Sequence, residues 1–225
     1  ILGEGNTSAR DGDNLWIKAS GEQMPTISPI GFVKVSTEKI VQILDQPRPS
    51  DDELRAILNA ARTDERTSNL PSTETFMHAW LLTLPDVNFV AHTHPVTTLG
   101  LVCSPQAEKF ARARLFPDQI VLCGPESVFV PYVAPGFDLA LAIRDACKEF
   151  TKRTGSQPKT ILLKNHGLIA LGKTANEALA ACLMTEKAAQ VFATAKNPNA
   201  LTKEEVDHIH NWTDEHFRQT KLWRE

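Results

Sequence analysis

The sequence predicts an α/β fold in which helices surround a mixed or antiparallel sheet. Short apolar runs of strand length alternate along the chain with longer amphipathic stretches of helical period. Two pairs of apolar runs are joined by turns that contain Gly or Pro, and such hairpins favour this fold over a doubly wound parallel sheet. The 225 residues suffice for one domain with a full core but are few for two. We therefore expect a single domain over residues 1–225, with a short N-terminal segment missing because the chain opens at Ile1.

The first half of the chain supplies strands, then helices, then a further strand. The expected elements are, in order, Leu15–Ser20 (strand), Gly31–Ser36 (strand), Asp51–Arg62 (helix), Pro71–Leu84 (helix) and Val87–His94 (strand). Ser50 or Asp51 can cap the first helix, and Ser72 or Thr73 can cap the second, which Pro85 ends. The proline after the third strand suits the first turn of another helix.

The second half continues the alternation. Its expected elements are a helix from Ser104 to Arg114, short strands at 119–123 and 128–132, a helix at Leu139–Arg153, strands at 160–163 and 168–171, and helices at Asn176–Lys196 and Lys203–Lys221. The Lys164–Gly167 turn makes the last two strands a hairpin. We expect the histidines of the last helix (His208, His210 and His216) to face solvent or a subunit contact.

Composition excludes several classes of partner. The net charge is −3 without a long Lys/Arg run, so a nucleic acid or an anionic membrane has no electrostatic support as a partner. No apolar stretch reaches the roughly 18–20 residues that a membrane helix needs. The four cysteines are widely spaced and show no paired pattern. We therefore expect free thiols and a cytoplasmic protein.

Three histidines are the main candidates for a chemical role. His92 and His94 end the apolar run VNFVAHTHP, and His166 stands in the turn of ILLKNHGLIALG. Side chains two apart on a strand share a face, with Cα atoms roughly 6.6 Å apart, so both imidazoles can reach one ion. A third histidine would complete a site with one position open for water or substrate, which is typical of catalytic zinc. Two alternatives stay open from the residues alone: ordinary strand side chains, and a plain turn residue in the case of His166.

Glu74 is the candidate acid–base group. We place it in the first turn of the helix after Pro71, where the positive helix terminus favours a carboxylate. It can ligate an ion or exchange a proton with substrate, or it can merely close a helix-capping arrangement. His78 lies one turn further on the same face, and we interpret it as a supporting or packing residue rather than a ligand.

Three polar segments are candidates for an anion cradle. They are Gly3–Ser8, Ala19–Gly21 and the pair Ser72–Thr73 at the start of the Glu74 helix. Backbone amides at a helix start, with hydroxyl and amide side chains, can bind phosphate or carboxylate. The P-loop pattern is absent, and plain turns are the alternative.

Five motifs in order along the chain resemble the class II aldolase/adducin family. They are GNTSAR at 5–10, IKASG at 17–21, PSTE at 71–74, AHTHP at 91–95 and LLKNHGLIALG at 162–172. The family includes L-fuculose-1-phosphate and L-rhamnulose-1-phosphate aldolases. The resemblance implies a three-layer α/β/α fold with a central, mostly antiparallel sheet. It also implies a homotetramer with C4 symmetry and sites between subunits.

The resemblance assigns a role to each candidate residue. His92, His94 and His166 match the family's metal ligands, and Glu74 matches its acid–base carboxylate. The segments that hold substrate phosphate in the family correspond here to Asn6, Ser20, Gly21, Ser72 and Thr73. The expected cofactor is one divalent ion, Zn²⁺ first, with Mn²⁺ or Co²⁺ as alternatives.

The implied activity is a metal-dependent aldolase that cleaves a ketose phosphate through a metal-stabilised enediolate. A decarboxylase, dehydratase or epimerase of the same fold is an alternative, although the epimerases tend to carry Asp where Glu74 stands. A non-catalytic adducin-like interaction module is the alternative from another class, although adducins lack the metal histidines. The tyrosine that acts as an acid in fuculose-phosphate aldolase has no match, because the chain's one tyrosine, Tyr132, lies later. Asp118 is the remaining candidate for a second proton carrier.

A Schiff-base mechanism would instead require a lysine that is removed from water. Lys18, Lys34 and Lys164 lie in or beside predicted strands and alternate with apolar residues. We expect all three side chains to face outward and to be solvated.

Overall fold

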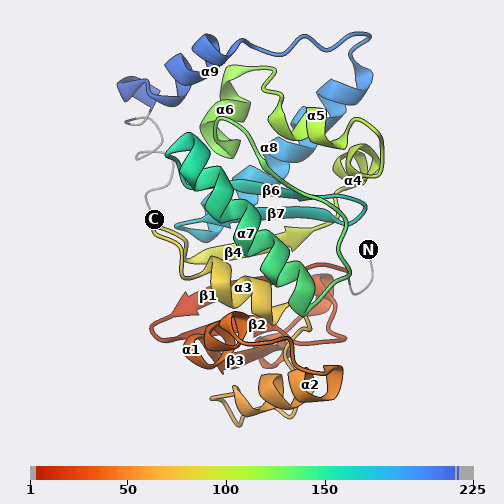
Figure 1. Cartoon of the computed structure of the whole chain (residues 1–225), viewed down its shortest axis with the longest axis vertical. Coiled ribbons are helices and arrows are strands. Elements are labelled where there is room, and N and C mark those ends of the chain that lie inside the picture. Colours follow the sequence, from red (N-terminus) through yellow and green to blue (C-terminus); the bar gives the residue numbers. More distant parts are fainter. Residues whose placement is uncertain (1–3, 216, 218–225) are drawn as a thin grey trace.

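The computed structural model describes residues 4–215 and residue 217. Within them the chain forms a seven-stranded sheet with helices on both faces (Figure 1). The strand order is β3-β2-β1-β4-β7-β6-β5, and neighbouring strands are antiparallel except for the parallel pair β5 and β6. The strands are β1 (Asn6–Asp11), β2 (Asn14–Lys18), β3 (Phe32–Ser36), β4 (Phe89–Thr93), β5 (Val128–Val130), β6 (Thr160–Leu163) and β7 (Gly167–Gly172).

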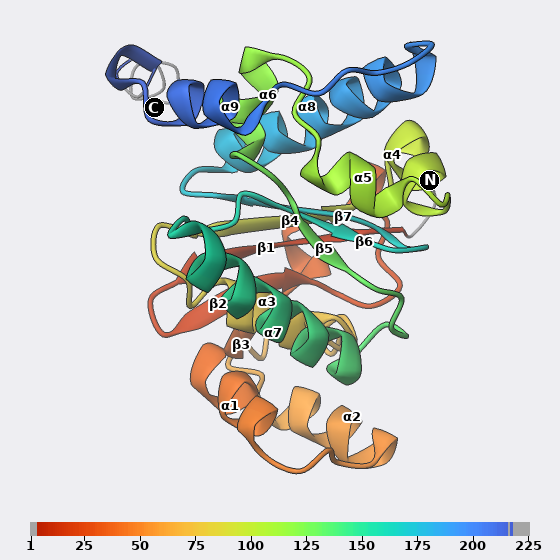
Figure 2. The same ribbon diagram turned by 45° about the horizontal axis from the view of Figure 1, so that its top comes forward.

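The helices form a layer on each face of the sheet, as Figure 2 shows. One layer contains α1 (Thr37–Val41), α2 (Asp51–Ala60), α3 (Thr75–Leu81) and α7 (Phe137–Thr154). The other contains α4 (Val96–Val102), α5 (Ala107–Arg112), α6 (Pro117–Cys123), α8 (Ala175–Thr194) and α9 (Lys203–His210). Three short 3₁₀ turns connect elements: η1 (Met24–Thr26), η2 (Pro29–Gly31) and η3 (Gln42–Asp45). The predicted three-layer α/β/α fold with a mostly antiparallel sheet is confirmed.

Strand β7 shows how the two apolar cores divide around the sheet. Ile169 and Leu171 belong to the core under α3 and α7, whereas Leu168 and Ala170 belong to the core under α5 and α8. Alternate side chains of a strand point to opposite faces, so a strand covered on both faces reads as a continuous apolar run. This is why the central hairpin of β6 and β7 was visible in the sequence.

The register at the centre of the sheet determines which residues meet at its edge. Asn6 of β1 lies opposite His92 of β4, and His92 lies opposite Ile169 of β7. The turn between β6 and β7 then carries His166 past the end of β4, with Asn165 in the left-handed region at φ 54°. Residues from β1, β4 and the β6–β7 turn are therefore brought to one end of the central strands.

Helix termini follow the predicted capping chemistry in one case and not in another. Ser50, one of the two predicted caps, is the N-cap of α2, and it also forms a reciprocal capping box with Glu53. The helix that carries His78 was predicted to start at Pro71, but α3 starts at Thr75. Ser72 instead closes a tight turn in front of α3, because its hydroxyl accepts from the Glu74 N–H at 3.3 Å and its carbonyl accepts from Thr75 Oγ1 at 2.6 Å.

Two strand predictions were wrong. Residues 119–123 belong to helix α6, which starts at Pro117 and is closed by Gly124 at φ 79°. A short apolar run fits a buried helix turn as well as a strand, and the flanking Pro and Gly were the helix signals. Conversely, the sequence predicts no strand over residues 6–11, because NTSARD has Ala9 as its single apolar residue and its buried Asn6 and Ser8 are polar.

The C-terminal helix is shorter than expected within the described residues. Helix α9 ends at His210, with Asn211 as its C-cap. His208 is exposed and His210 is partly buried, while His216 and the expected helix end at Lys221 lie outside the described residues. No helix in the part of the chain that the structure describes is long and apolar enough to span a bilayer.

Candidate active site

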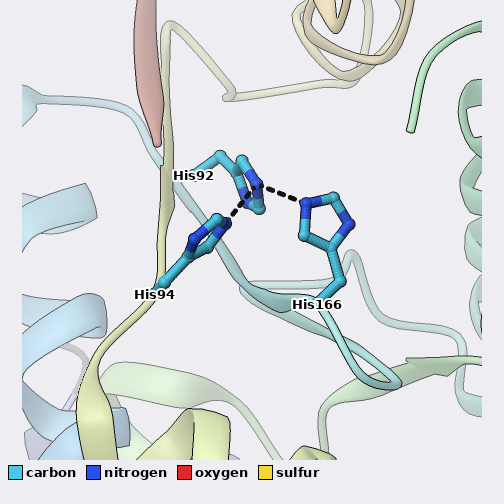
Figure 3. A group of neighbouring side chains, drawn as sticks. All are labelled: His92, His94 and His166. Carbon is cyan, nitrogen blue, oxygen red and sulfur yellow. Dashed lines mark hydrogen bonds between the residues drawn. The ribbon is translucent and has the colours of Figure 1, made fainter. Parts of the chain in front are cut away.

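The three predicted histidines converge on one point (Figure 3). His92 Nε2 lies 3.1 Å from His94 Nε2 and 3.2 Å from His166 Nε2, and the three candidate ligand atoms all lie within 4.8 Å of one another. Nitrogens bound to one tetrahedral zinc at about 2.0–2.1 Å would be roughly 3.3 Å apart. The histidine cluster therefore needs only small adjustments to hold one divalent ion.

Local backbone features bring the rings together. His92 is on β4, and His94 follows the end of that strand. Gly167 opens β7 directly after His166, and a Cβ built there would come within 2.5 Å of His94 Cδ2 and 2.7 Å of the Thr93 carbonyl. Only glycine leaves room for the His94 ring at this close approach between β4 and the β6–β7 turn.

The protonation state of His92 suits metal binding. Its Nδ1 lies 3.0 Å from the Leu168 carbonyl, which can only accept, so Nδ1 carries the proton and Nε2 presents its lone pair to the cluster. Burial, together with the neighbouring rings of His166 and His94, lowers the pKa of His92 to about 3. Burial also lowers the pKa of His166. These two imidazoles are thus neutral near pH 7, which is the form that ligates metal.

Glu74 adds a carboxylate at the edge of the histidine cluster. Its Oε2 lies 3.6 Å from His92 Nε2, and its Oε1 lies 3.5 Å from His166 Nε2. Among the described residues, Glu74 Oε1 and His166 Nδ1 are buried without a hydrogen-bond partner. Such atoms are costly unless something else occupies the space beside them, so the vicinity of Glu74 Oε1 fits a bound ion or substrate group.

The position of Glu74 differs in one respect from the expectation. It is not in the first turn of the helix but precedes Thr75 as the N-cap residue, and its side chain makes no capping bond to α3 in the described structure. Instead Oε2 accepts from Asn6 Nδ2 at 2.7 Å. The alternative that Glu74 merely caps a helix therefore does not describe its contacts.

The expected anion-cradle residues fall into a buried and an exposed group. Asn6 and Ser72 are buried and share a hydrogen bond of 3.3 Å, whereas Ser20, Gly21 and Thr73 are exposed. The segments that carry them are adjacent, because Ala19 bridges to Pro71 and Ser20 N donates to the Leu70 carbonyl at 2.9 Å. Gly21 has φ 83°, which favours glycine in this turn. Their role in binding phosphate stays a prediction.

The expectation for one lysine was wrong. Lys18 is only 3 % exposed, and its Nζ donates to the Ala19 carbonyl at 3.4 Å. Burial lowers the pKa of Lys18, while the charges of Glu22 and Glu74 oppose that shift. Lys164 is exposed and Lys34 pairs with Asp11 at 2.7 Å near the surface. Strand alternation misled here, because β2 ends at Lys18 and the adjoining 19–21 and 70–73 segments are packed together.

His78 has hydrogen-bonding contacts that the sequence did not indicate. His78 is fully buried and contacts both Ser8 and Asn6. Its position one helical turn after Glu74 was the available signal. Asp118, the candidate second proton carrier, is exposed on α6 and is not one of the three residues of the histidine cluster. Tyr132 is exposed after β5.

Comparisons with known proteins agree with this architecture. The sequence profile described as Class II Aldolase and Adducin N-terminal domain matches residues 2–193. The chain is 26% identical over 181 residues to the protein named uncharacterized oxidoreductase YuxG of Bacillus subtilis, covering 76% of this chain but 24% of that protein. It thus spans about a quarter of the length of this relative. It is also 25% identical over 209 residues to a 5-methylthioribulose-1-phosphate/5-deoxyribulose-1-phosphate aldolase of Rhodospirillum rubrum, covering 91% of this chain and 79% of that protein.

Solved structures show the same fold. An N-terminal class II aldolase domain from Thermoplasma acidophilum superimposes with a TM-score of 0.66 at 26% identity, covering 86% of this chain and 85% of that one. An L-fuculose 1-phosphate aldolase superimposes with a TM-score of 0.71 at 19% identity, covering 96% and 87%. At that identity the second likeness supports the fold alone.

Proposed function

The chain belongs to the class II aldolase and adducin family, and from that premise we propose that it is a divalent-metal-dependent lyase that cleaves a carbon–carbon bond in a ketose phosphate. The observation that carries the proposal is the convergence of three imidazole nitrogens beside a carboxylate oxygen that has no hydrogen-bond partner within the described residues. A structural metal site would have four protein ligands, whereas three histidines leave a position for substrate.

His92, His94 and His166 would hold the ion. Zn²⁺ is our first choice, because the ligand set is three neutral imidazoles, and Mn²⁺ or Co²⁺ would also suit these nitrogens. When bound, the ion would supply an electrophile that stabilises the negative charge developing on substrate oxygens as the bond breaks. The Leu168 carbonyl would keep the proton of His92 on Nδ1 and so keep Nε2 available as a ligand.

Glu74 would move the proton. In the cleavage direction it would deliver a proton to the carbon that keeps the bonding electrons, and in the condensation direction it would remove that proton. Its Oε1 is the oxygen suited to this task, because its Oε2 already accepts from Asn6. Water is excluded from the carboxylate by its burial, which strengthens its interaction with a nearby charge.

The substrate phosphate would bind where the 19–21 and 70–73 segments adjoin. Ser20, Gly21 and Thr73 would supply exposed donors, and the Asn6 amide would link the buried Ser72 hydroxyl to Glu74. Lys18 would add positive charge to this anion cradle, since its ammonium group lies near the cradle segments rather than in bulk water. Binding the phosphate would fix the register of the reacting carbon relative to Glu74.

Two other functions use the same residues. A decarboxylase, dehydratase or epimerase of this fold would need the same ion and the same proton carrier, and it would differ only in the group that leaves. An adducin-like interaction module would need neither the ion nor Glu74. A Schiff-base mechanism would require a buried lysine. Because Lys18 is buried, experiments must also exclude this mechanism.

A product screen tests the proposal. Purified protein would be analysed for metal content and then incubated with a panel of ketose phosphates and β-keto acids, with and without chelator. We expect about one divalent ion per chain, release of dihydroxyacetone phosphate or an aldehyde, and recovery of activity when metal is restored. Carbon dioxide as the product would indicate a decarboxylase, and a metal-free protein without activity would indicate an interaction module. Activity that survives chelator and is trapped by borohydride would instead point to Lys18.

We further propose a single domain, a homotetramer and a cytoplasmic location. Family resemblance supports the tetramer, and the free, widely spaced cysteines support a reducing compartment. Light scattering of the purified protein tests the tetramer directly.

A further inference from the structure

A chain of three buried hydrogen bonds leads from strand β1 to Glu74. Ser8 Oγ lies 2.7 Å from His78 Nδ1, His78 Nε2 contacts Asn6 Oδ1, and Asn6 Nδ2 lies 2.7 Å from Glu74 Oε2. The side chains come from β1, α3 and the turn before α3, and all four are buried. His78 is 0 % exposed. We call this set the Ser8–Glu74 chain.

Chemistry gives the Ser8–Glu74 chain a single direction. A carboxylate only accepts, so Asn6 turns its NH₂ group toward Glu74 Oε2 and its carbonyl oxygen toward His78. His78 Nε2 must then be the donor, which leaves Nδ1 to accept from the Ser8 hydroxyl. Burial lowers the pKa of His78 to about 3 despite the opposing charge of Glu74, so the ring carries only one proton.

The two oxygens of Glu74 are thereby made unequal. Oε2 is held by Asn6, whereas Oε1 has no partner among the described residues and lies 3.5 Å from His166 Nε2. Rotation of the carboxyl group out of its present plane would break the bond from Asn6. Rotation of the Asn6 amide would place its carbonyl oxygen against the Glu74 carboxylate, which is two acceptors, and its NH₂ group against the donating Nε2–H of His78, which is two donors.

We propose that Ser8, His78 and Asn6 are positioning residues that fix the carboxyl plane of Glu74, so that Oε1 alone exchanges protons with the substrate. This inference rests on the proposed role of Glu74 as the proton carrier. His78 acts through Asn6 and does not touch the substrate. Its function is to hold the Asn6 amide in one of its two orientations, which a side chain without a donor cannot do.

Two substitutions at His78 separate positioning from packing. His78→Gln keeps a donor for Asn6 and an acceptor for Ser8, whereas His78→Leu keeps apolar volume and removes both. We expect His78→Leu to lower kcat by about 10- to 100-fold with KM little changed, and His78→Gln to recover most of that loss. Thr160→Val is the matched control, because Thr160 shares a buried hydroxyl pair with Ser127 at 2.7 Å on β6, at the strand end away from His166. It should lower stability and leave kcat unchanged.

A second readout does not depend on activity. ¹⁵N NMR of histidine-labelled protein without added metal should show His78 as the neutral Nε2–H tautomer. Its Nε2 resonance should move in Asn6→Leu, and its Nδ1 resonance should move in Ser8→Ala. A ring protonated on Nδ1, or resonances indifferent to both substitutions, would overturn the proposal, as would a His78→Leu variant that keeps wild-type kcat. If the wild-type protein cleaves no ketose phosphate, the proposed function fails. The ¹⁵N NMR measurement of the His78 tautomer, and of its response to Asn6→Leu and Ser8→Ala, still decides whether the Ser8–Glu74 chain exists.

Discussion

His78 and His92 are equally buried, and burial lowers the pKa of each imidazole to about 3. The two histidines differ in the hydrogen-bond partners of their ring nitrogens. Both nitrogens of His78 have partners inside the protein, namely Ser8 and Asn6. His92 has a partner for Nδ1 in the Leu168 carbonyl, but its Nε2 faces the Nε2 atoms of His94 and His166.

The difference shows that burial alone does not identify a metal ligand. A neutral buried histidine has one donor and one acceptor, and a closed network such as that of His78 satisfies both. In the histidine cluster the three Nε2 atoms face one another, so their lone pairs cannot all accept a hydrogen bond. We call it the open cluster for this reason. An ion satisfies all of them at once. Glu74 lies between the two networks, because Oε2 belongs to the first and Oε1 faces the second.

The largest expected effect comes from opening the histidine cluster. His94→Ala should weaken binding of the divalent ion by more than about 100-fold and abolish activity, because two imidazoles and a free position no longer define a site. Metal titration measures the affinity, and circular dichroism should show an unchanged fold. His78→Gln should keep about one ion per chain. Full metal occupancy in His94→Ala would show that the three histidines do not form the metal site.

The next effect concerns Glu74, where the two networks meet. Glu74→Gln keeps the shape and a bond to Asn6 but cannot exchange a proton, so catalysis should fall by about 10²–10⁴-fold. The ion should stay bound. Solvent deuterium incorporation at the reacting carbon measures the lost step. Unchanged incorporation would place the proton carrier elsewhere.

The sequence predicted the open cluster better than the closed network. His92, His94 and His166 stood out because histidines beside strand ends and glycine turns are unusual among apolar runs. Ser8 and His78 carried no such signal, since a serine on a polar strand and a histidine on a helix are common. Their pairing depends on strand β1, which the sequence concealed because its buried residues are polar. The contact between Ser8 and His78 joins residues 70 positions apart in the chain, so it depends on the tertiary structure.

The same limit explains Lys18 and helix α6. Alternation places Lys18 on the outer side of β2, and only the packing of the adjoining segments makes its ammonium group inaccessible. In α6 the apolar run fits either a strand or a helix, and the flanking proline and glycine decide. Periodicity therefore predicted the central hairpin and the long helices well, while short or polar elements required the fold itself.

The free energy of unfolding should depend on pH through the two buried histidines, His78 and His92. His78 and His92 have an ordinary pKa of 6.5 when unfolded and about 3 when folded, so below pH 6.5 the unfolded chain binds more protons than the native protein. Stability should therefore fall as the pH drops from 6.5 toward 3, by about 1.4 kcal/mol per pH unit for each histidine. Denaturant titrations of the metal-free protein measure this slope. His78→Gln should remove one of the two contributions, and an identical slope in that variant would show that His78 titrates normally.

The smallest effect tests the support beneath the open cluster. Glu186 of α8 accepts from the backbone N–H groups of Thr97 and Thr98 at 3.0 Å and 2.9 Å, and from Thr98 Oγ1 at 2.8 Å. It thereby holds the start of α4, which follows His94 by two residues. Hydrogen bonds to both amides lower the pKa of its carboxyl group against the opposing effect of burial.

Glu186→Ala should cost about 1 kcal/mol of stability, as for loss of a helix cap, and should weaken the divalent ion by less than about 10-fold. Ile209→Ala on α9 is the control, because it removes a partly buried side chain from an element that carries none of the three histidines. If both variants lose equal stability but only Glu186→Ala loses metal affinity, the open cluster depends on support from a second helix layer. His78 should then keep its tautomer in both variants, because its partners lie on β1 and not on α4. A change in that tautomer in Glu186→Ala would mean that the two histidine environments are coupled through Glu74 and are not separate networks.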